Sequence, residues 1–249
     1  MVRLFPIRTG ARRAPSDFRH RPLAPDTLLE MVTSTFLRSI EFFDGFDDEG
    51  LTTLVQGCST ASFHRGDALF AEGDAASELF VVMSGRIAIA NRSADGRESV
   101  LALMGPRDLF GEMALFDDQG RTAAARALEM SEVAVVPYEL LRSSFESDAK
   151  TLWIVVRLLS RRLKEANEAL ADSVFLDVTG RTAKRLLDMA GDGEEFQLPI
   201  TQEELAGMIG ASRERVNKAI AAFIRLGWLE QRDRTYKIVD RRRMTLRAS

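Results

Sequence analysis

The sequence predicts an α+β protein that consists of an antiparallel β-roll, a long helix and a C-terminal winged helix-turn-helix, in that order. Three observations lead to this fold class: short alternating apolar runs with glycines between Ser59 and Pro137, a heptad pattern from Leu152 to Leu170, and a basic helical hairpin near the C-terminus. Alternating runs with glycine turns are typical of antiparallel strands, whereas a 3.5-residue repeat is typical of a coiled-coil helix. Strands and helices therefore occupy separate segments.

The composition restricts the class of protein. The chain has 249 residues, of which 45% are apolar, so it can bury one large core or two modest ones. Cys58 is the only cysteine, which excludes an intramolecular disulfide and a thiolate zinc site made by one chain, and suits a reducing compartment. No apolar run approaches the roughly 18 residues of a membrane span, and the N-terminus lacks the apolar centre of a signal peptide. We therefore expect a cytoplasmic protein without a membrane partner.

The charges are segregated along the chain. The net charge is only -3, yet residues 1–30 hold six basic against three acidic residues, residues 31–210 hold 17 against 30, and residues 211–249 hold 11 against four. A solvated tail is the common explanation of a basic terminus, whereas a motif that carries the charges indicates a polyanion partner.

The segment before the first glycine-rich runs has two parts. Four prolines and scattered arginines predict a flexible basic extension over residues 1–30. Apolar residues at helical spacing, interrupted by "DGFDDEG", then predict two short helices between 34 and 56.

Short strands follow up to Pro137. Runs such as "LFVVMSGRIAIA", "SVLALMG" and "VAVVPY" alternate in polarity and are separated by glycines. This pattern indicates a small antiparallel barrel or roll, and Asp95-Gly96 is a hairpin turn signal within it. The roll and its short helices should span residues 31–138.

The segment 139–176 is predicted to form a dimerisation helix. Its apolar residues are spaced 4-3-4-3-4, as in the seam of a coiled coil: Leu152, Val156, Leu159, Leu163, Ala166 and Leu170. A long helix that packs only on its own domain is the alternative. Trp153, Ile154, Val155 and Leu158 offer the roll a second apolar face, however, so both contacts can coexist. A parallel homodimer is the preferred interpretation.

The final segment, 177–249, contains a helix-turn-helix. Asp177 stands at an N-cap position, and "ITQEELAGMIGASRERVNKAI" has two apolar helix faces joined at Gly210. Helical hairpins that do not bind DNA share this spacing, so the spacing alone is compatible with a DNA-binding motif and with a purely structural hairpin. The outward residues of the second helix favour DNA, because they form a polar, basic cluster in its first two turns: Arg213, Glu214, Asn217 and Lys218. Arg232, Arg234 and Lys237 then lie in a predicted two-stranded wing.

The stretch "FGEMALFDDQGRT", residues 110–122, joins Glu112 to Arg121 across a turn-rich segment. The two side chains can form a surface ion pair, a catalytic pair, or two walls of a pocket for a small anion. Catalysis is the least favoured of these, because no nucleophile with a positioned base appears nearby. His20 and His64 stand alone, outside any metal-ligand constellation.

These motifs occur together in one known family. In order, "FxxGDALFxEGD", "LFVVMSGRI", "FGEMALF", "RTAAARA", "FLDVTGR" and "GASRERVNKAI" resemble the CRP/FNR family of bacterial transcription regulators over about residues 34–240. The amino-acid sequence of the helix-turn-helix and wing is most similar to that of the actinobacterial cyclic AMP-responsive members. The resemblance implies a jelly-roll cyclic-nucleotide-binding domain, a dimerisation helix and a winged helix-turn-helix, with cyclic AMP as allosteric effector, no metal and no enzymatic activity.

The resemblance also implies a role for each residue of a phosphate-binding cassette. Arg121 would pair with the cyclic phosphate, Thr122 would add a hydroxyl donor, and Glu112 would accept from the ribose 2'-hydroxyl. The ligand-binding residues of the cassette are Gly111, Glu112, Met113, Ala114, Arg121 and Thr122. The chemistry is reasonable, because guanidinium forks and backbone amides suit a phosphodiester.

Two residues of the long helix complete the implied pocket. Arg162 would support Glu112, and Asn167 would reach the adenine amino group across the dimer. Ala166 departs from the pattern, since cyclic AMP binders usually have threonine there, so one hydrogen bond to the base, worth about 1 kcal/mol, should be missing. The choice between cyclic AMP and cyclic GMP is therefore open.

For the other end of the chain, the family implies sequence-specific binding of double-stranded DNA by a homodimer on a palindromic, TGTGA-like operator. Arg213, Glu214 and Lys218 would read bases, with Asn217 on the same face. The residues that would contact the phosphates of the DNA backbone are Thr201, Gln202, Ser212 and Arg215. RNA polymerase is a further expected partner if the protein is an activator. The alternatives are DNA binding that is independent of nucleotide, and a nucleotide-gated subunit that acts on a protein.

Overall fold

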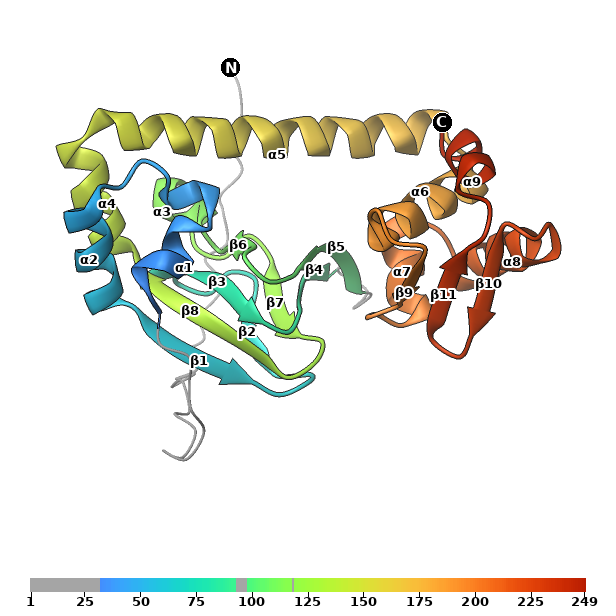
Figure 1. Cartoon of the computed structure of the whole chain (residues 1–249), viewed down its shortest axis with the longest axis horizontal. Coiled ribbons are helices and arrows are strands. Elements are labelled where there is room, and N and C mark those ends of the chain that lie inside the picture. The colour runs from blue at the N-terminus through green and yellow to red at the C-terminus, as the bar shows by residue number, and fades with distance from the viewer. Residues whose placement is uncertain (1–31, 93–97, 118) are drawn as a thin grey trace, which may run out of the picture.

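The computed structural model describes residues 32–92, 98–117 and 119–249. A β-roll forms one end, helix α5 (Ala149–Phe175) runs along the molecule, and a small helical domain lies at the far end of α5 (Figure 1). This order of roll, long helix and winged helix is the predicted one. The basic extension 1–30 and the Asp95-Gly96 turn fall outside the described residues.

The roll consists of two four-stranded antiparallel sheets. Their orders are β1-β8-β3-β6 and β2-β7-β4-β5, so neighbours in space are mostly distant in sequence. The strands are β1 (Ser59–Phe63), β2 (Ala68–Phe70), β3 (Glu78–Ser84), β4 (Ile87–Arg92), β5 (Glu98–Met104), β6 (Leu109–Phe110), β7 (Ala124–Ala127) and β8 (Ser131–Pro137). The alternating runs of the sequence thus form strands whose apolar side chains fill the roll, as predicted.

Short helices close the end of the roll next to the start of α5. They are α1 (Ser34–Arg38), the 3-10 turn η1 (Glu41–Phe43), α2 (Asp48–Gly57) and α4 (Tyr138–Ser147), while α3 (Met113–Asp117) lies between β6 and β7. Asp47 accepts a hydrogen bond from the Gly50 amide at 2.8 Å and so starts α2 inside the "DGFDDEG" interruption. Phe42, Phe43 and Phe46 are buried against this end of the roll.

The predicted dimerisation segment contains two helices rather than one. The backbone of Asp148 is extended between α4 and α5, and its side chain accepts from the Lys150 amide at 2.9 Å, so a new helix begins there. At 27 residues α5 is about 40 Å long. Ile154, Val155 and Leu158 are buried, as predicted.

The placement of Trp153 in the same apolar face was wrong. Its side chain is 69% exposed, because each residue advances a helix by about 100°, which turns Trp153 away from the face that Ile154 and Leu158 present to the roll. Trp153 instead flanks the heptad positions, whose leucines and valine are also exposed.

The C-terminal domain is a helix-turn-helix with a three-stranded sheet. Its elements are α6 (Val178–Ala190), β9 (Glu195–Gln197), α7 (Gln202–Ile209), α8 (Arg213–Arg225), β10 (Leu229–Arg232), β11 (Thr235–Ile238) and α9 (Arg241–Arg247). Asp177 caps α6 by accepting from the Gly180 amide at 2.8 Å. Gly210 has the left-handed conformation, with φ of 68°, which permits the tight turn into α8.

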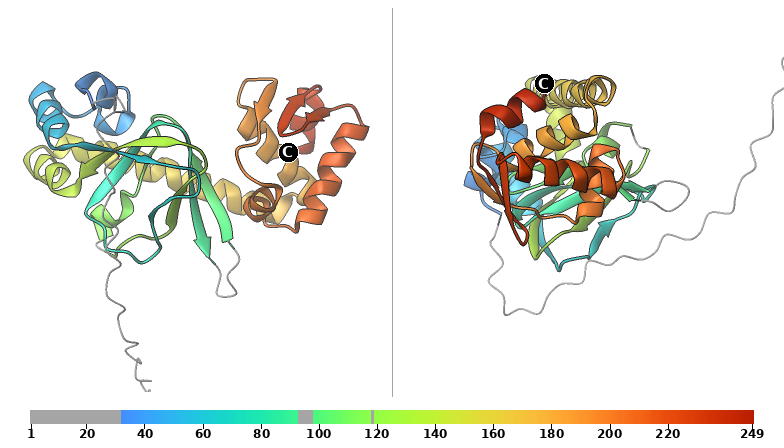
Figure 2. Two further views of the ribbon diagram at one scale, coloured as in Figure 1. Left: turned by 90° about the horizontal axis from the view of Figure 1, so that it is seen from below. Right: turned by 90° about the vertical axis from the view of Figure 1, so that its right-hand side faces the viewer.

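The roll and the C-terminal domain touch each other through β5 and α7. Ser99 Oγ donates to the Gly207 carbonyl at 3.2 Å, and Arg126 of β7 forms an ion pair with Glu204 of α7. Apolar side chains of β4 and β5 join the same buried cluster as the core of the helix-turn-helix. Helix α8 lies on the side of this domain that faces away from the roll (Figures 1 and 2).

Candidate functional site

A pocket opens between the roll and α5, with a volume of about 410 Å³ when open solvent is included. Most of its wall comes from the segment 110–123. The lining residues are Phe70, Ile89, Met104, Phe110, Gly111, Glu112, Met113, Ala114, Gly120, Arg121, Thr122, Ala123 and Arg162. The fold thus brings seven of the eight predicted pocket residues together, and only Asn167 lies apart.

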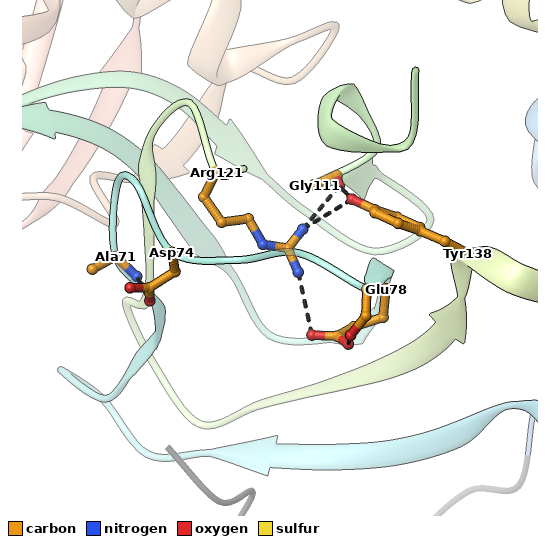
Figure 3. A network of polar contacts seen from close by, with 7 residues as sticks. Ala71, Asp74, Glu78, Gly111, Arg121 and Tyr138 are labelled. Atoms are coloured by element: carbon orange, nitrogen blue, oxygen red, sulfur yellow. Dashed lines mark hydrogen bonds and ion pairs between the residues drawn. The ribbon is translucent and has the colours of Figure 1, made fainter. Parts of the chain in front are cut away.

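Arg121 is buried and held by three groups of its own chain. Its Nη1 donates to the Gly111 carbonyl at 2.9 Å and to the Tyr138 hydroxyl at 3.3 Å, while its Nη2 lies 3.3 Å from Oε1 of Glu78 (Figure 3). The exposed fraction of the Arg121 side chain is 2% and that of the Glu78 side chain is 24%. The guanidinium is therefore fixed in place beneath the cassette.

Two aromatic rings flank the same guanidinium. Its carbon lies 4.2 Å from the centroid of the Phe70 ring and 5.2 Å from that of Phe80, within the range of cation-π attraction. The Nε atom is buried and has no hydrogen-bond partner in the described structure. An unpaired buried donor costs about 1 to 3 kcal/mol, more on a charged group, so Arg121 retains an unmet requirement for an acceptor.

Glu112 is fully buried beside Arg162. Its Oε1 lies 2.6 Å from Nη1 of Arg162, whose Nη2 donates to the Leu109 carbonyl at 2.8 Å. Both carboxylate oxygens are enclosed and neither has a hydrogen-bond partner among the described residues, so Oε2, which is also outside the ion pair, is left without any partner there. Burial raises the pKa of Glu112 above the usual carboxyl value, and the positive charge of Arg162 opposes that rise. The pocket therefore contains a hydrogen-bond acceptor without a donor, on Glu112, and a hydrogen-bond donor without an acceptor, on Arg121.

Gly111 is required by the backbone and by the space around it. Its φ is +80°, and a Cβ there would lie 2.6 Å from Nη1 of Arg121. Its carbonyl also accepts a hydrogen bond from the Tyr138 hydroxyl. Burial raises the pKa of Tyr138 to about 12, so the hydroxyl stays protonated well above neutral pH and can donate this hydrogen bond.

The other cassette residues lie at the rim of the pocket. Ala114 is buried in α3, whereas Met113 is 45% exposed. Thr122 is exposed, and its hydroxyl lies 3.7 Å from Sδ of Met113, a weak acceptor. The Thr122 hydroxyl is thus accessible at the entrance of the pocket.

Sequence reasoning missed Glu78 and Tyr138, the side chains that hold Arg121. Glu78 is 43 residues and Tyr138 is 17 residues from Arg121 in the chain, and neither belongs to a pattern shared with it. Asn167 is exposed on α5, one and a half turns beyond Arg162 and outside the pocket lining. Its predicted contact across a dimer remains a prediction.

The helix-turn-helix is built by local caps. Thr201 and Glu204 form a reciprocal capping box, with hydrogen bonds of 3.2 and 2.6 Å, and Ser212 caps α8 by accepting from the Arg215 amide. Both hydroxyls act as acceptors in these caps, so their protons remain available as donors. Gln202 begins α7 and is partly exposed.

The first two turns of α8 present charged groups to solvent. Arg213, Glu214, Arg215 and Lys218 are exposed, and Glu214 pairs with Lys218 at 2.9 Å. This pair lowers the pKa of Glu214. Asn217 differs from the prediction, because it lies beside the buried Val216 and is only partly exposed. Its Oδ1 is buried and has no hydrogen-bond partner among the described residues.

The wing is larger than predicted, since β9 adds a third strand to β10 and β11. Arg232 and Lys237 are exposed on it. Arg234 donates to the carbonyls of Leu198 and Ile200 at 3.3 Å each, so its guanidinium holds the loop before α7.

Residues 32–92, 98–117 and 119–249 offer neither a membrane span nor a metal cluster. None of the helices there is long and apolar enough to cross a bilayer. The same residues contain no cluster of three or more His, Cys, Asp or Glu side chains that could hold a metal ion.

A buried cassette with an unmet donor and an unmet acceptor, joined by one helix to a winged helix-turn-helix, defines a ligand-sensing DNA-binding regulator. Comparison with known proteins agrees. Residues 60–148 match the cyclic nucleotide-binding domain, and residues 180–247 match the Crp-like helix-turn-helix domain. The chain belongs to the CRP/FNR family of transcription regulators.

Several relatives document this membership. A CRP-like cAMP-activated global transcriptional regulator of Mycobacterium tuberculosis is 37% identical over 213 residues, which cover 83% of this chain and 95% of the relative. The cAMP-activated regulator Vfr of Pseudomonas aeruginosa is 28% identical and covers 77% of this chain and 94% of its own. The structure of the c-di-GMP responsive regulator CLP of Xanthomonas campestris superposes with a TM-score of 0.65, at 28% identity, over 77% of this chain and 99% of that one. These relatives are regulators and not enzymes, as expected for this chain.

Proposed function

We propose that this chain is a cyclic AMP-responsive, sequence-specific regulator of transcription that acts in the cytoplasm as a homodimer on a palindromic operator resembling TGTGA…TCACA. The observation that carries the proposal is the pair of unmet buried groups in one pocket, Nε of Arg121 and Oε2 of Glu112. The first is a donor on a cation and the second is an acceptor.

A nucleoside cyclic phosphate satisfies both groups. Its phosphodiester carries one negative charge and several acceptor oxygens, which suit Arg121 and the Thr122 hydroxyl. A ribose hydroxyl can donate to Glu112, and a ligand that lacks this hydroxyl would leave the buried carboxylate unpaired. Phe70, Ile89 and Met104 supply an apolar wall for the rest of the ligand.

Cyclic AMP is the preferred effector because the relative of highest identity named above is called cAMP-activated. CLP, a relative of lower identity, is called c-di-GMP responsive, so the fold is compatible with more than one nucleotide. Ala166 also lacks the side-chain hydroxyl that cyclic AMP binders usually have at this position. Titration calorimetry should therefore compare cyclic AMP, cyclic GMP and cyclic di-GMP.

The exposed apolar stripe on α5 supports a homodimer. Leu152, Val156, Leu159, Leu163 and Leu170 are each between 41% and 64% exposed, although a soluble helix normally buries such residues. The heptad spacing matches a second copy of the same helix, and Asn167 on that helix would then approach the pocket of the other chain. Two recognition helices in such a dimer would meet half-sites about 34 Å apart.

One route for coupling runs along α5. Arg162 of α5 contacts Glu112 in the pocket, and the Leu176 carbonyl at the end of α5 accepts a hydrogen bond from Arg181 at 2.8 Å. Arg181 also donates to the Ile209 carbonyl at the end of α7, at 2.9 Å. A ligand that favours one position of α5 would thus bias the helix-turn-helix, and DNA would in turn favour the ligand.

The experiment that tests the proposal measures DNA affinity by fluorescence anisotropy with and without saturating cyclic AMP. We expect tighter operator binding with the nucleotide, by the 5- to 150-fold that is typical of allosteric coupling, or about 1 to 3 kcal/mol. An unchanged dissociation constant would favour nucleotide-independent DNA binding. Absence of any operator preference would favour a subunit that acts on a protein. RNA polymerase becomes an expected partner if the bound operator lies upstream of an activated promoter.

Arg213→Ala should weaken operator binding by about 1 to 3 kcal/mol, because arginine in the first turn of a recognition helix can bind guanine bidentately. Binding to DNA with a scrambled operator should change much less. Arg225→Ala is a matched control, since Arg225 is also exposed but ends the same helix. Equal losses on both DNAs would indicate a phosphate contact, and equal losses for the two variants would argue against base reading by Arg213.

A further inference from the structure

Arg121 already has a negative partner within its own chain. Oε1 of Glu78, at the start of β3, lies 3.3 Å from Nη2 of Arg121 (Figure 3). The other carboxylate oxygen of Glu78 accepts a hydrogen bond from the Ser77 hydroxyl, which orients the carboxylate. Glu78 is not part of the pocket lining, so it approaches the guanidinium from outside the pocket.

The charges in and around the pocket therefore cancel. Arg121 is paired with Glu78, and Arg162 is paired with Glu112. A phosphodiester that binds Arg121 brings a further negative charge to a guanidinium whose charge is already balanced. Like charges that share one cation in a poorly solvated site repel each other, and burial strengthens the repulsion.

We propose that Glu78 is an internal counter-anion that competes with the effector phosphate for Arg121 and so sets the affinity of the pocket for phosphate-bearing ligands. The inference rests on the proposed function of the pocket and adds a residue that determines its affinity. Because the Glu78 side chain is 24% exposed, its carboxylate can turn toward water when an anion arrives, whereas Arg121 is enclosed and stays.

The same contact has an opposite effect on the ligand-free protein. Glu78 compensates a cation that is almost fully buried, and loss of one partner of a buried pair destabilises a fold. A neutral residue at position 78 should therefore lower the thermal stability of the ligand-free protein and raise its affinity for the phosphate-bearing ligand. If the role of Glu78 is purely structural, the same substitution should lower the thermal stability without raising the affinity for the ligand.

The test uses the full-length protein with Glu78→Gln, which keeps the size of the side chain and removes its charge. Titration calorimetry with cyclic AMP should show binding about tenfold tighter than in the wild type, equivalent to about 1.4 kcal/mol. The affinity for adenosine, which has no phosphate, should stay the same. Glu72→Gln is the matched control, because Glu72 is an exposed carboxylate in the loop just before β3. Glu78→Ala serves as a second variant if the first is poorly folded.

Each outcome decides between the possibilities. Tighter cyclic AMP binding by Glu78→Gln with no change in Glu72→Gln supports the role of Glu78 as a counter-anion. Measurable binding by Glu78→Gln where the wild type shows none supports it as well. Unchanged or weaker binding by the variant, where the wild type binds, overturns this inference only and makes Glu78 a support for Arg121. If neither protein binds a cyclic nucleotide, both the inference and the proposed function fail.

Discussion

Arg121→Ala is expected to weaken cyclic AMP binding by at least about 100-fold, which corresponds to about 2.7 kcal/mol. The reason is the chemistry of the contact: charge-assisted hydrogen bonds to a phosphate are worth about 1.5 to 3 kcal/mol each, and a guanidinium can make two in parallel. The variant removes Nε of Arg121, the buried donor that has no hydrogen-bond partner in the described structure and is available to the phosphate. Titration calorimetry on the purified protein measures the loss.

Two further variants sharpen this experiment. Arg121→Lys keeps the charge and removes the planar fork, so its affinity should fall between those of the wild type and the alanine variant. Arg65→Ala, in an exposed loop of the roll, should leave binding unchanged. Circular dichroism must show that Arg121→Ala is folded, because Glu78 loses its cationic partner there and the Gly111 carbonyl keeps only its hydrogen bond from Tyr138. Cyclic AMP binding within about threefold of the wild type would contradict the proposed pocket.

Leu163→Glu should convert the protein from a dimer to a monomer. Leu163 occupies the middle of the exposed heptad stripe and is 62% exposed in the single chain, so the substitution should not disturb the fold of the protomer. In a dimer each copy would instead bury an unpaired carboxylate in the seam, at a cost of about 3 to 5 kcal/mol for an uncompensated charge. Sedimentation velocity at several concentrations measures the change in mass.

Operator binding provides an independent readout for this variant. A monomer can occupy only one half of a palindrome, so its affinity for the full operator should fall sharply while its affinity for nonspecific DNA changes little. Lys164→Glu, one residue further along α5 and outside the heptad positions, is the control and should remain a dimer. An unchanged mass for Leu163→Glu would show that the apolar stripe serves another contact.

The sequence by itself determined the features that depend on local patterns. Alternating polarity over residues 59–137 predicted the strands of the roll, because a strand exposes and buries successive side chains regardless of which strand lies beside it. The start of α6 at Asp177 and the turn at Gly210 were equally predictable, since a cap and a left-handed glycine act on the nearest few residues. Glu112 and Arg121 were predicted to be pocket walls by the resemblance of the segment 110–122 to a known cassette, whereas the residues alone also allowed a surface ion pair.

Only the tertiary structure decided which distant groups share a partner. The contacts of Arg121 with Glu78 and Tyr138 arise because β3, β8 and the cassette converge at one end of the roll, and no short-range pattern encodes that convergence. The exposure of Trp153 and the partial burial of Asn217 depended likewise on how each helix is rotated against its neighbours. The packing of α7 on the roll includes an ion pair between Arg126 of β7 and Glu204 of α7, which are 78 positions apart in the chain. Such contacts follow from the closure of the whole chain around its cores, which is why the sequence predicted the cassette but not the counter-anion behind it.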